Sequence, residues 1–478
     1  MKDWEKLLIG IVWVVTACLC ASPLSAQQEG GEKPKPAARE YPPLFDPNGD
    51  QADSDEGAKT IQPDNWPVTG VQNLTLGTPE MRHSYWVPGF RYSNTAASNP
   101  SNSGANSQWN TTSFVSGDVS LLEAWSRSLL SANYSGGGFF STDQVQGSGK
   151  FHQLAATYEI DRRRYQLLFV DQFSFLPQSS FGFGGTSGLA SPGITGSLGV
   201  PLPGLQSGVV PGQSILTAVG PRYSNATAAQ LTYQVSARGS ITIAGVHGLL
   251  RFTRSRNLGN DTETLNAGYN YAITPKDTLG LSYRFSAYHY PGDPQALGDH
   301  AVQIVYGKKI TGRLALRLSG GPQVTTFRVP VNGLKQSISG SGTASLNYAF
   351  SRSNVTLNYT HGVTGGSGVF SGARTDQISA TWGRALTRVW SGSMNLGYAK
   401  NRQLSAVSGV TSPSFSTWIV GAGLSRPLGR TANISLGYQA QIQGSNIAIC
   451  SSPNCGSSST AHQVFLSFQW HARPLVLR

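Results

Sequence analysis

Four histidines, His289, His300, His361 and His462, are the residues of this sequence best suited to acid–base chemistry. Each falls near the end of a segment in which apolar and polar residues alternate. A hydrolase needs a nucleophile, a base and an orienting group close together on neighbouring elements. The spacing of these histidines assembles no such triad. We therefore expect them to be structural or solvated, and we expect the protein not to be an enzyme.

The cysteines beyond the first residues point to a disulfide rather than to a metal. Cys450 and Cys455 flank a turn-rich stretch, and a pair this close in an exported chain predicts a small disulfide loop. Half of a metal site is the alternative, but no matching cluster of cysteine and histidine accompanies the pair. No Walker or Rossmann sequence occurs in the required context either, so we expect neither metal nor cofactor.

A third group of residues is predicted to line an internal passage: Arg284, Arg317, Tyr288 and Asn270. They occupy polar positions of the alternating segments described below. Guanidinium groups that face a passage favour anions by Coulomb attraction. The alternative is that the arginines pair with acidic residues as part of the packing. Few acidic residues fall inside the alternating segments, which favours a weak anion preference.

The first residues predict export. Two lysines precede an apolar run at residues 7–21, and a small-residue cleavage site ends at Ala26. These are the parts of a secretory signal peptide, which we place at residues 1–26. A lipoprotein signal is the alternative, because the residues before Cys18 resemble a lipobox. The run is too short to favour a transmembrane anchor.

Residues 27–81 differ from the rest of the chain because they are rich in proline and acidic residues and show no periodicity. This composition predicts a flexible, disordered periplasmic leader. It would act as a tether or as a docking arm for a periplasmic partner. Residues 82–478 then form the folded domain.

The composition narrows the fold class. Charged residues make up 13% of the 478 residues, about half the usual share of roughly 25%. Glycine (56 residues) and small polar residues replace them, and aromatics reach 10%. A helical bundle would need more Glu and Lys, whereas this mixture suits a repeated β architecture. The net charge of +12 is compatible with nucleic-acid binding, but the export signal argues against a nucleic-acid partner.

Alternation with a period of two runs from about residue 82 to the end of the chain and places one set of side chains on each face of a sheet. The polar face carries Ser, Thr, Asn, Gln and Gly instead of Lys and Glu, and aromatics gather near the ends of the apolar face. Clear examples are residues 265–273, 279–288, 338–350, 354–360 and 464–470. Segments of about ten residues with this pattern are typical of a transmembrane β-barrel.

The connections predict the strand number. Short turns alternate with longer connections such as 291–299, as in bacterial barrels with short periplasmic turns and long external loops. Counting hairpins back from a periplasmic C-terminus predicts an antiparallel up-and-down barrel of about 18 strands that begins near Tyr85 despite Pro88; 16 strands is the alternative. The connection 176–225 is exceptionally long. It would be either a lid inside the barrel or an external loop.

The signal peptide, the leader, the alternating strands and the final segment 464–470 together resemble Gram-negative outer-membrane β-barrel proteins. More loosely, the chain is similar to porin-like barrels found with exopolysaccharide secretion systems. In the outer-membrane class the last strand ends the chain on an aromatic residue, whereas here Trp470 is followed by residues 471–478. The resemblance implies an outer-membrane location and contact with outer-membrane lipid and the barrel-assembly machinery.

These observations predict a passive or gated channel for small hydrophilic solutes. The first alternative is the barrel component of an exopolysaccharide secretion system, which would pass a polysaccharide and dock a partner through residues 27–81. The second is a secreted surface protein with a β-solenoid fold.

Overall fold

The computed structural model describes residues 84–98, 109–142, 147–176, 221–253, 258–366, 368–404, 413–446 and 459–476. The expected signal peptide, leader and cysteine pair lie outside these residues, and so does the long connection apart from its two ends. In the described part of the chain, no helix has the length and hydrophobicity needed to cross a bilayer.

Strands make up almost all of the described residues. In chain order they are β1 (Tyr85–Ser98), β2 (Trp109–Ala124), β3 (Ser128–Ser141), β4 (Gly149–Asp161), β5 (Tyr165–Leu176), β6 (Arg222–Gln234), β7 (Gly239–Phe252), β8 (Asn260–Ala272), β9 (Asp277–His289), β10 (Ala296–Thr311), β11 (Leu314–Val331), β12 (Leu334–Ala349), β13 (Ser353–Thr364), β14 (Ala373–Ala385), β15 (Ser391–Gln403), β16 (Ser414–Leu428), β17 (Ala432–Ser445), β18 (Ser459–His471) and β19 (Leu475–Val476).

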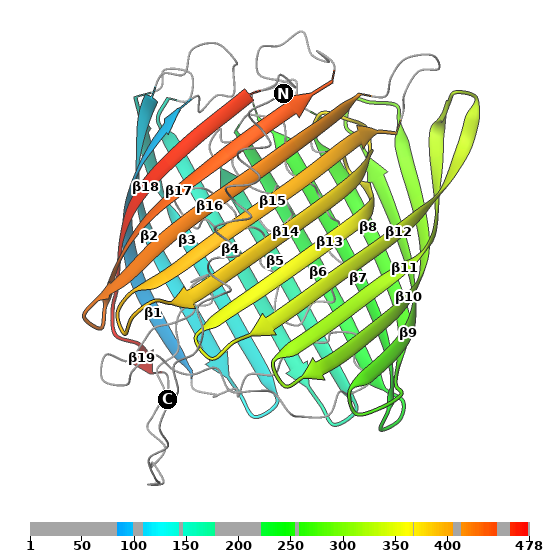
Figure 1. Cartoon of the computed structure of the whole chain (residues 1–478), viewed down its shortest axis with the longest axis horizontal. Helices are drawn as coiled ribbons and strands as arrows, with labels where there is room; N and C mark the ends of the chain where they lie inside the picture. Colours follow the sequence, from blue (N-terminus) through cyan, green and yellow to red (C-terminus); the bar gives the residue numbers. More distant parts are fainter. Residues whose placement is uncertain are drawn as a thin grey trace, which may run out of the picture. The chain divides into compact units, whose positions relative to one another are not determined.

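The 18 long strands form a closed barrel. From β1 to β18 each strand pairs antiparallel with the next along the chain, and β1 pairs with β18 from Gly89↔His471 to Ala97↔Gln463. Figure 1 shows the tilted strands wrapping around the barrel. The predicted antiparallel up-and-down barrel of 18 strands is therefore confirmed, and the alternatives of 16 strands and of a β-solenoid are wrong.

The ends of the first and last strands depart from a simple hairpin series. β1 begins at Tyr85 as predicted, and Pro88 is accommodated within it. After β18, the backbone N–H of Ala472 donates to the carbonyl of Pro88 at 2.8 Å. The two-residue β19 then pairs with Tyr85 and Trp86. The segment that follows Trp470 thus extends the seam between the ends of the chain.

The connections segregate by length. Within the described residues, every link of two to five residues except the β11–β12 turn joins an even-numbered strand to the next odd-numbered one, so these links lie at one end of the barrel, called the short-turn end. Every link from an odd-numbered strand to the next even-numbered one lies at the opposite, long-loop end. All of these links are longer than five residues except the β11–β12 turn. That exception closes a hairpin in which Asn332 and Gly333 adopt positive φ, as two-residue hairpin turns require.

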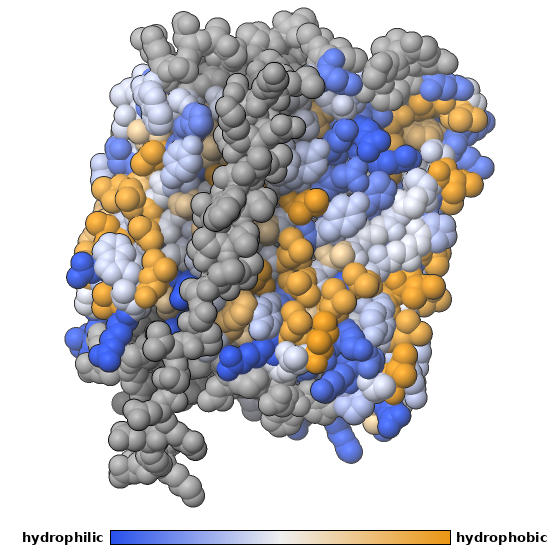
Figure 2. All heavy atoms as spheres, in the orientation of Figure 1, coloured by the Kyte–Doolittle hydropathy of each residue, from blue (hydrophilic) through white to orange (hydrophobic). Residues whose placement is uncertain are grey.

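The barrel wall has an apolar outer face and a polar inner face, as the alternation predicted. On β9, Leu281 and Tyr283 are 56% and 39% exposed on the outside, whereas Ser282 and Ser286 face inward and are buried. On the face shown in Figure 2, hydrophobic residues lie mostly at mid-height, with hydrophilic residues gathered nearer the edges. A hydrocarbon-facing band of this kind is typical of membrane-spanning barrels.

Aromatic residues mark both edges of the apolar band. Near the short-turn end, Tyr348 and Phe350 make an edge-on ring contact, and Arg426 lies over the ring of Trp390. Near the long-loop end the same cross-strand arrangement occurs three times, with a tyrosine hydroxyl hydrogen-bonded to a histidine Nδ1: Tyr134–His152 at 2.9 Å, Tyr283–His300 at 2.8 Å and Tyr438–His462 at 2.8 Å. Amphipathic rings at two levels are expected at the two interfaces of a bilayer.

Candidate functional site on the inner wall

The clearest cluster of ionisable residues on the inner wall forms where β9, β10 and β11 run side by side. Arg284 of β9 and Gln323 of β11 both lie directly opposite Ala301 of β10. The small side chain of Ala301 leaves space for both long side chains. Two residues along β10, Asp299 points to the same face because side chains alternate along a strand. Three strands therefore bring Arg284, Gln323 and Asp299 together.

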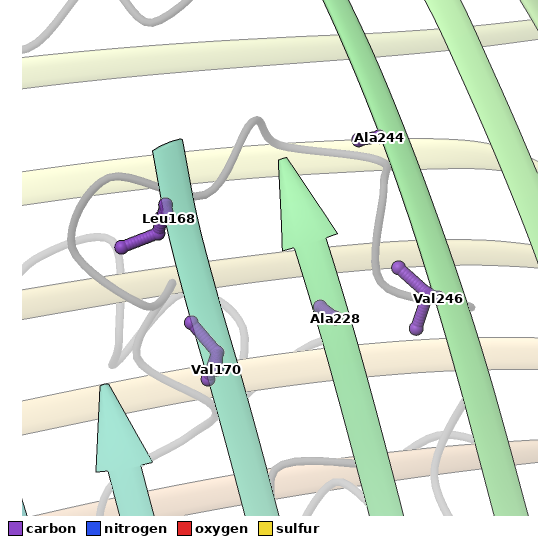
Figure 3. Close-up of a cluster of buried hydrophobic side chains, with 5 residues drawn as sticks. All are labelled: Leu168, Val170, Ala228, Ala244 and Val246. Carbon is purple, nitrogen blue, oxygen red and sulfur yellow. The ribbon is translucent and has the colours of Figure 1, made fainter. Parts of the chain in front are cut away.

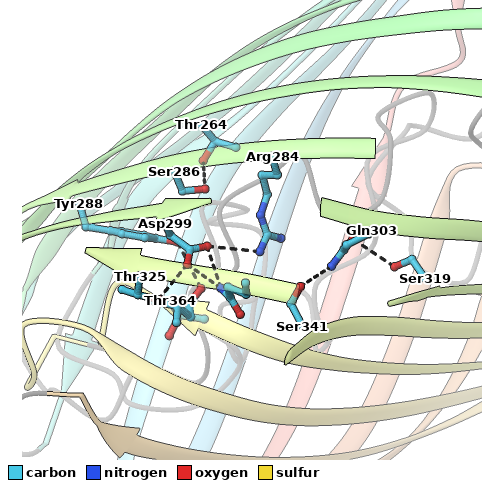
Figure 4. A network of polar contacts seen from close by, with 12 residues as sticks. Thr264, Arg284, Ser286, Tyr288, Asp299, Gln303, Ser319, Thr325, Ser341 and Thr364 are labelled. Atoms are coloured by element: carbon cyan, nitrogen blue, oxygen red, sulfur yellow. Dashed lines mark hydrogen bonds and ion pairs between the residues drawn. The ribbon is translucent and has the colours of Figure 1, made fainter. Parts of the chain in front are cut away.

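Asp299 is the centre of this cluster, as Figure 4 shows. The Nε2 of Gln323 donates to both carboxylate oxygens, at 2.8 and 2.7 Å, and the Oγ1 of Thr325 donates to Oδ1 at 3.0 Å. The Nη2 of Arg284 lies 3.7 Å from Oδ2. A buried carboxylate costs free energy unless it is paired and hydrogen-bonded, and these contacts meet that need.

The cluster keeps polar groups that the protein does not satisfy. Asp299 is completely buried, whereas the side chain of Arg284 is 18% exposed. The Nε of Arg284 and the Oε1 of Gln323 have no hydrogen-bond partner within the described structure. Both atoms are themselves buried, so within this cluster only the exposed part of the Arg284 side chain can meet water or a polar solute. The cluster therefore reaches the interior of the barrel through Arg284, while Asp299, Gln323 and Thr325 lie buried beneath it.

Hydroxyl and amide groups continue this surface along the wall. The Nε2 of Gln303 donates to Ser341 at 2.8 Å, and the Oγ of Ser319 contacts Gln303 and Thr343 at 3.3 and 2.8 Å. Farther round, the Oγ1 of Thr375 bonds to Thr364 and Asn401, both at 2.8 Å. Together with the Asp299 cluster, these residues on β9–β15 form what we call the inner polar belt.

A different surface lies on the inner side of β5, β6 and β7. Five apolar side chains gather there, all at most 5% exposed, as Figure 3 shows: Leu168, Val170, Ala228, Ala244 and Val246. We call them the inner apolar patch. Sequence reasoning did not separate this patch from the polar positions around it, because the inward positions of β5–β7 mix Gln, Ser and Thr with aliphatic residues. The inner wall therefore has an apolar side as well as a polar belt.

The four residues predicted to line the passage all lie on the inner face, but they do not form one site. Arg284 belongs to the inner polar belt. Tyr288 packs in an apolar cluster with Leu297 and neighbouring residues, and its hydroxyl donates to a backbone carbonyl at 3.3 Å. Asn270 and Arg317 lie nearer the short-turn end and are 2% and 7% exposed. That these residues line an open path stays a prediction.

Two expectations about charge need correction. Arg284 has an acidic partner, so for this residue the packing alternative holds. Asp299 was missed because residues 291–299 were assigned to a loop, whereas β10 begins at Ala296. Arg251 of β7 lies on the outer side by strand alternation and pairs with Asp261 at 2.7 Å.

The rim histidines are not brought together. By strand alternation His289, His300, His361 and His462 lie on the outer face near the long-loop end, on β9, β10, β13 and β18. Two of them join tyrosines, and His361 contacts Asp376 at 2.6 Å. Across the described residues, no group of three or more His, Cys, Asp or Glu could hold a metal ion.

Comparisons with known proteins give structural likeness without a family. No family model matches the sequence, and no curated protein matches it. Similar solved structures include the outer membrane protein OpdK of Pseudomonas aeruginosa, with 10% identity over 81% of this chain and 98% of that chain and a TM-score of 0.41. OccK9 (OpdG) of P. aeruginosa has 11% identity over 82% and 98%, with a TM-score of 0.41.

A third similar structure is OccAB3 of Acinetobacter baumannii, with 9% identity over 81% of this chain and 99% of that chain and a TM-score of 0.40. Likeness of this degree assigns no family. The barrel architecture rests on the strand pairings described above.

Proposed function

We propose that the chain is an outer-membrane channel through which small hydrophilic solutes diffuse. The observation that carries this proposal is the closed barrel of 18 strands with an apolar outer face and hydrogen-bonding groups along its inner face. A barrel of 16–18 strands is wide enough for an aqueous channel. The inner polar belt would replace part of the solute's hydration as it passes.

The charge of the inner wall supports a weak preference for anions. By strand alternation the described inner positions carry six basic residues (Arg91, Arg222, Arg284, Lys309, Arg317 and Lys335) and four acidic ones (Asp118, Glu159, Asp161 and Asp299). Six positive and four negative charges leave a net +2, with histidine neutral. Selectivity of this origin is small because most of the inner charge cancels.

We further propose that the connection 176–225 folds into the barrel and narrows it. Leu176 and Arg222, at its two ends, pair directly across β5 and β6, so the segment leaves and re-enters the wall at one place. It carries no Asp, Glu, Lys or Arg between residues 172 and 221. The inner apolar patch lies on the same two strands and on β7. An uncharged segment anchored above an apolar surface gains free energy by covering it.

Single-channel recording in planar bilayers tests the function and the gate together. The wild-type protein and a variant lacking residues 185–215 would be refolded in detergent and inserted separately. We expect ion conductance from both, and a several-fold larger conductance from the deletion variant. Equal conductance would refute the lid, and a folded protein that conducts in neither form would refute the channel. A barrel that conducts only after a periplasmic partner is added would favour the secretion alternative.

A further inference from the structure

The outer wall carries a concentration of cations near the long-loop end of β14 and β15. By strand alternation Arg374, Lys400 and Arg402 share the outer face with Ile378 and Met394, which are 42% and 46% exposed. We call the three cations the outer basic cluster. The face on which β13–β15 run carries a group of hydrophilic residues toward its upper edge in Figure 2.

One carboxylate lies among these cations, and its contacts are already taken. Asp376 contacts the Nδ1 of His361 at 2.6 Å, accepts a hydrogen bond from the hydroxyl of Tyr359 at 3.3 Å and lies 3.3 Å from the Nη2 of Arg402. In the part of the chain that the structure describes, neither Arg374 nor Lys400 makes an ion pair. Three cations and one carboxylate leave the cluster with a net charge of +2, with histidine neutral.

The strand register makes this arrangement unfavourable for the protein alone. Arg374 lies directly opposite Arg402 across β14 and β15, and like charges at directly opposed positions destabilise a sheet. The outward Arg251 at the same end of the barrel shows the contrast, because Asp261 neutralises it at 2.7 Å. Among the described residues no further carboxylate neutralises the outer basic cluster, so a negatively charged partner would stabilise it.

The position of the cluster indicates where that charge comes from. Tyr398 of β15 lies directly opposite Trp418 of β16, with ring centroids 4.5 Å apart, on the outer face. Aromatic pairs of this kind mark the membrane interface. Lys400 and Arg402 follow Tyr398 toward the long-loop end, roughly 7 and 13 Å farther along the strand at about 3.3 Å per residue. They lie at the level of lipid headgroups.

We propose that the outer basic cluster binds the phosphate groups of an anionic lipid in the leaflet at the long-loop end. Arg374 and Lys400 supply the charge, because a guanidinium offers paired donors to phosphate and an ammonium acts as a point charge. Ser414 and Ser416 lie opposite Arg402 and Lys400 on β16 and add hydroxyl donors at the same level. This inference rests on the membrane location proposed above.

Lipid binding by matched variants tests the inference. The test variant carries Arg374→Gln and Lys400→Gln, which removes the two unpaired cations. The control carries Arg384→Gln and Arg388→Gln, which removes two cations near the short-turn end of β14. Each protein is refolded in a neutral detergent and titrated with diphosphorylated lipid A, with its dephosphorylated form and with inorganic phosphate. Native mass spectrometry measures the bound fraction.

We expect the affinity of the test variant for diphosphorylated lipid A to fall about 25-fold, at roughly five-fold for each cation near a charged membrane surface. The control should bind as the wild type does. Equal affinity of the test variant and the wild type for diphosphorylated lipid A would overturn the proposal. Equal affinity of the wild type for the phosphorylated and dephosphorylated lipids would also overturn it. So would the same difference between wild type and test variant when inorganic phosphate replaces the lipid.

Two further measurements keep the result interpretable. If the test variant does not fold, the preference of the wild-type protein for the phosphorylated lipid decides the question, and its absence would overturn the proposal. Conductance is recorded on the same preparations. A protein that inserts and conducts without this preference refutes the lipid site alone, whereas a folded protein that does not conduct refutes the proposed function.

Discussion

Replacing Asp299 by asparagine should strengthen the anion preference of the channel. In the wild type, Arg284 and Asp299 lie 3.7 Å apart, so their fields largely cancel at larger distances. Asparagine keeps an acceptor for Gln323 and Thr325 and removes the negative charge. Arg284 then acts on passing ions with its full charge, and the net charge of the described inner positions rises from +2 to +3.

The size of the effect follows from Coulomb's law. For an ion about 7 Å from the guanidinium in water, the interaction is roughly 0.6 kcal/mol, and screening in 0.1 M salt reduces it by about half. About 0.3 kcal/mol changes the local concentration by a factor of roughly 1.7. Because chloride is enriched and potassium is depleted, the permeability ratio of chloride to potassium should rise about three-fold.

The reversal potential in a tenfold KCl gradient measures this ratio. Asp277→Asn is the matched control, because Asp277 lies at the short-turn end, where it pairs with Lys308 on the outer face, and its removal should leave the reversal potential unchanged. Heat-modifiable migration in detergent gels would verify that both variants fold. A folded Asp299→Asn protein with the wild-type reversal potential would refute the claim that this cluster faces the ion path.

Three further predictions concern stability, each measured as the free energy of unfolding in guanidinium. Asp299→Ala should cost about 3–5 kcal/mol, because it leaves a guanidinium and an amide without their partner, whereas Asp299→Asn should cost much less; equal losses would contradict this. Gly137→Ala should lower the free energy of unfolding by about 1–3 kcal/mol, because its added Cβ would overlap the carbonyl oxygen of Val115. Its control, Gly340→Ala, should leave the free energy of unfolding nearly unchanged, because the space around Gly340 is open. Removing residues 472–478 should lower stability by about 1 kcal/mol or less, because few backbone hydrogen bonds of the seam depend on them; a loss of barrel closure would show that the tail does more.

Local patterning was enough to predict the barrel. A period of two assigns every strand residue to one of two faces, and short turns in an up-and-down barrel make sequence neighbours into spatial neighbours. These two rules gave the antiparallel barrel, its 18 strands and the inward position of Arg284, Tyr288, Asn270 and Arg317. The strand boundaries were less accurate, and the wrong start of β10 concealed Asp299.

Which residues meet in the Asp299 cluster and in the outer basic cluster was decided by the strand register and by the closure of the barrel wall. Arg284 and Gln323 come from strands that are not adjacent, and they meet because both lie opposite Ala301. Arg374 opposes Arg402 only in the observed alignment of β14 with β15. A slip of one residue would turn a whole strand over, so these contacts follow from the pairing of complete strands. Alternation along the chain therefore selects the face of each side chain, and the assembled sheet selects its partners.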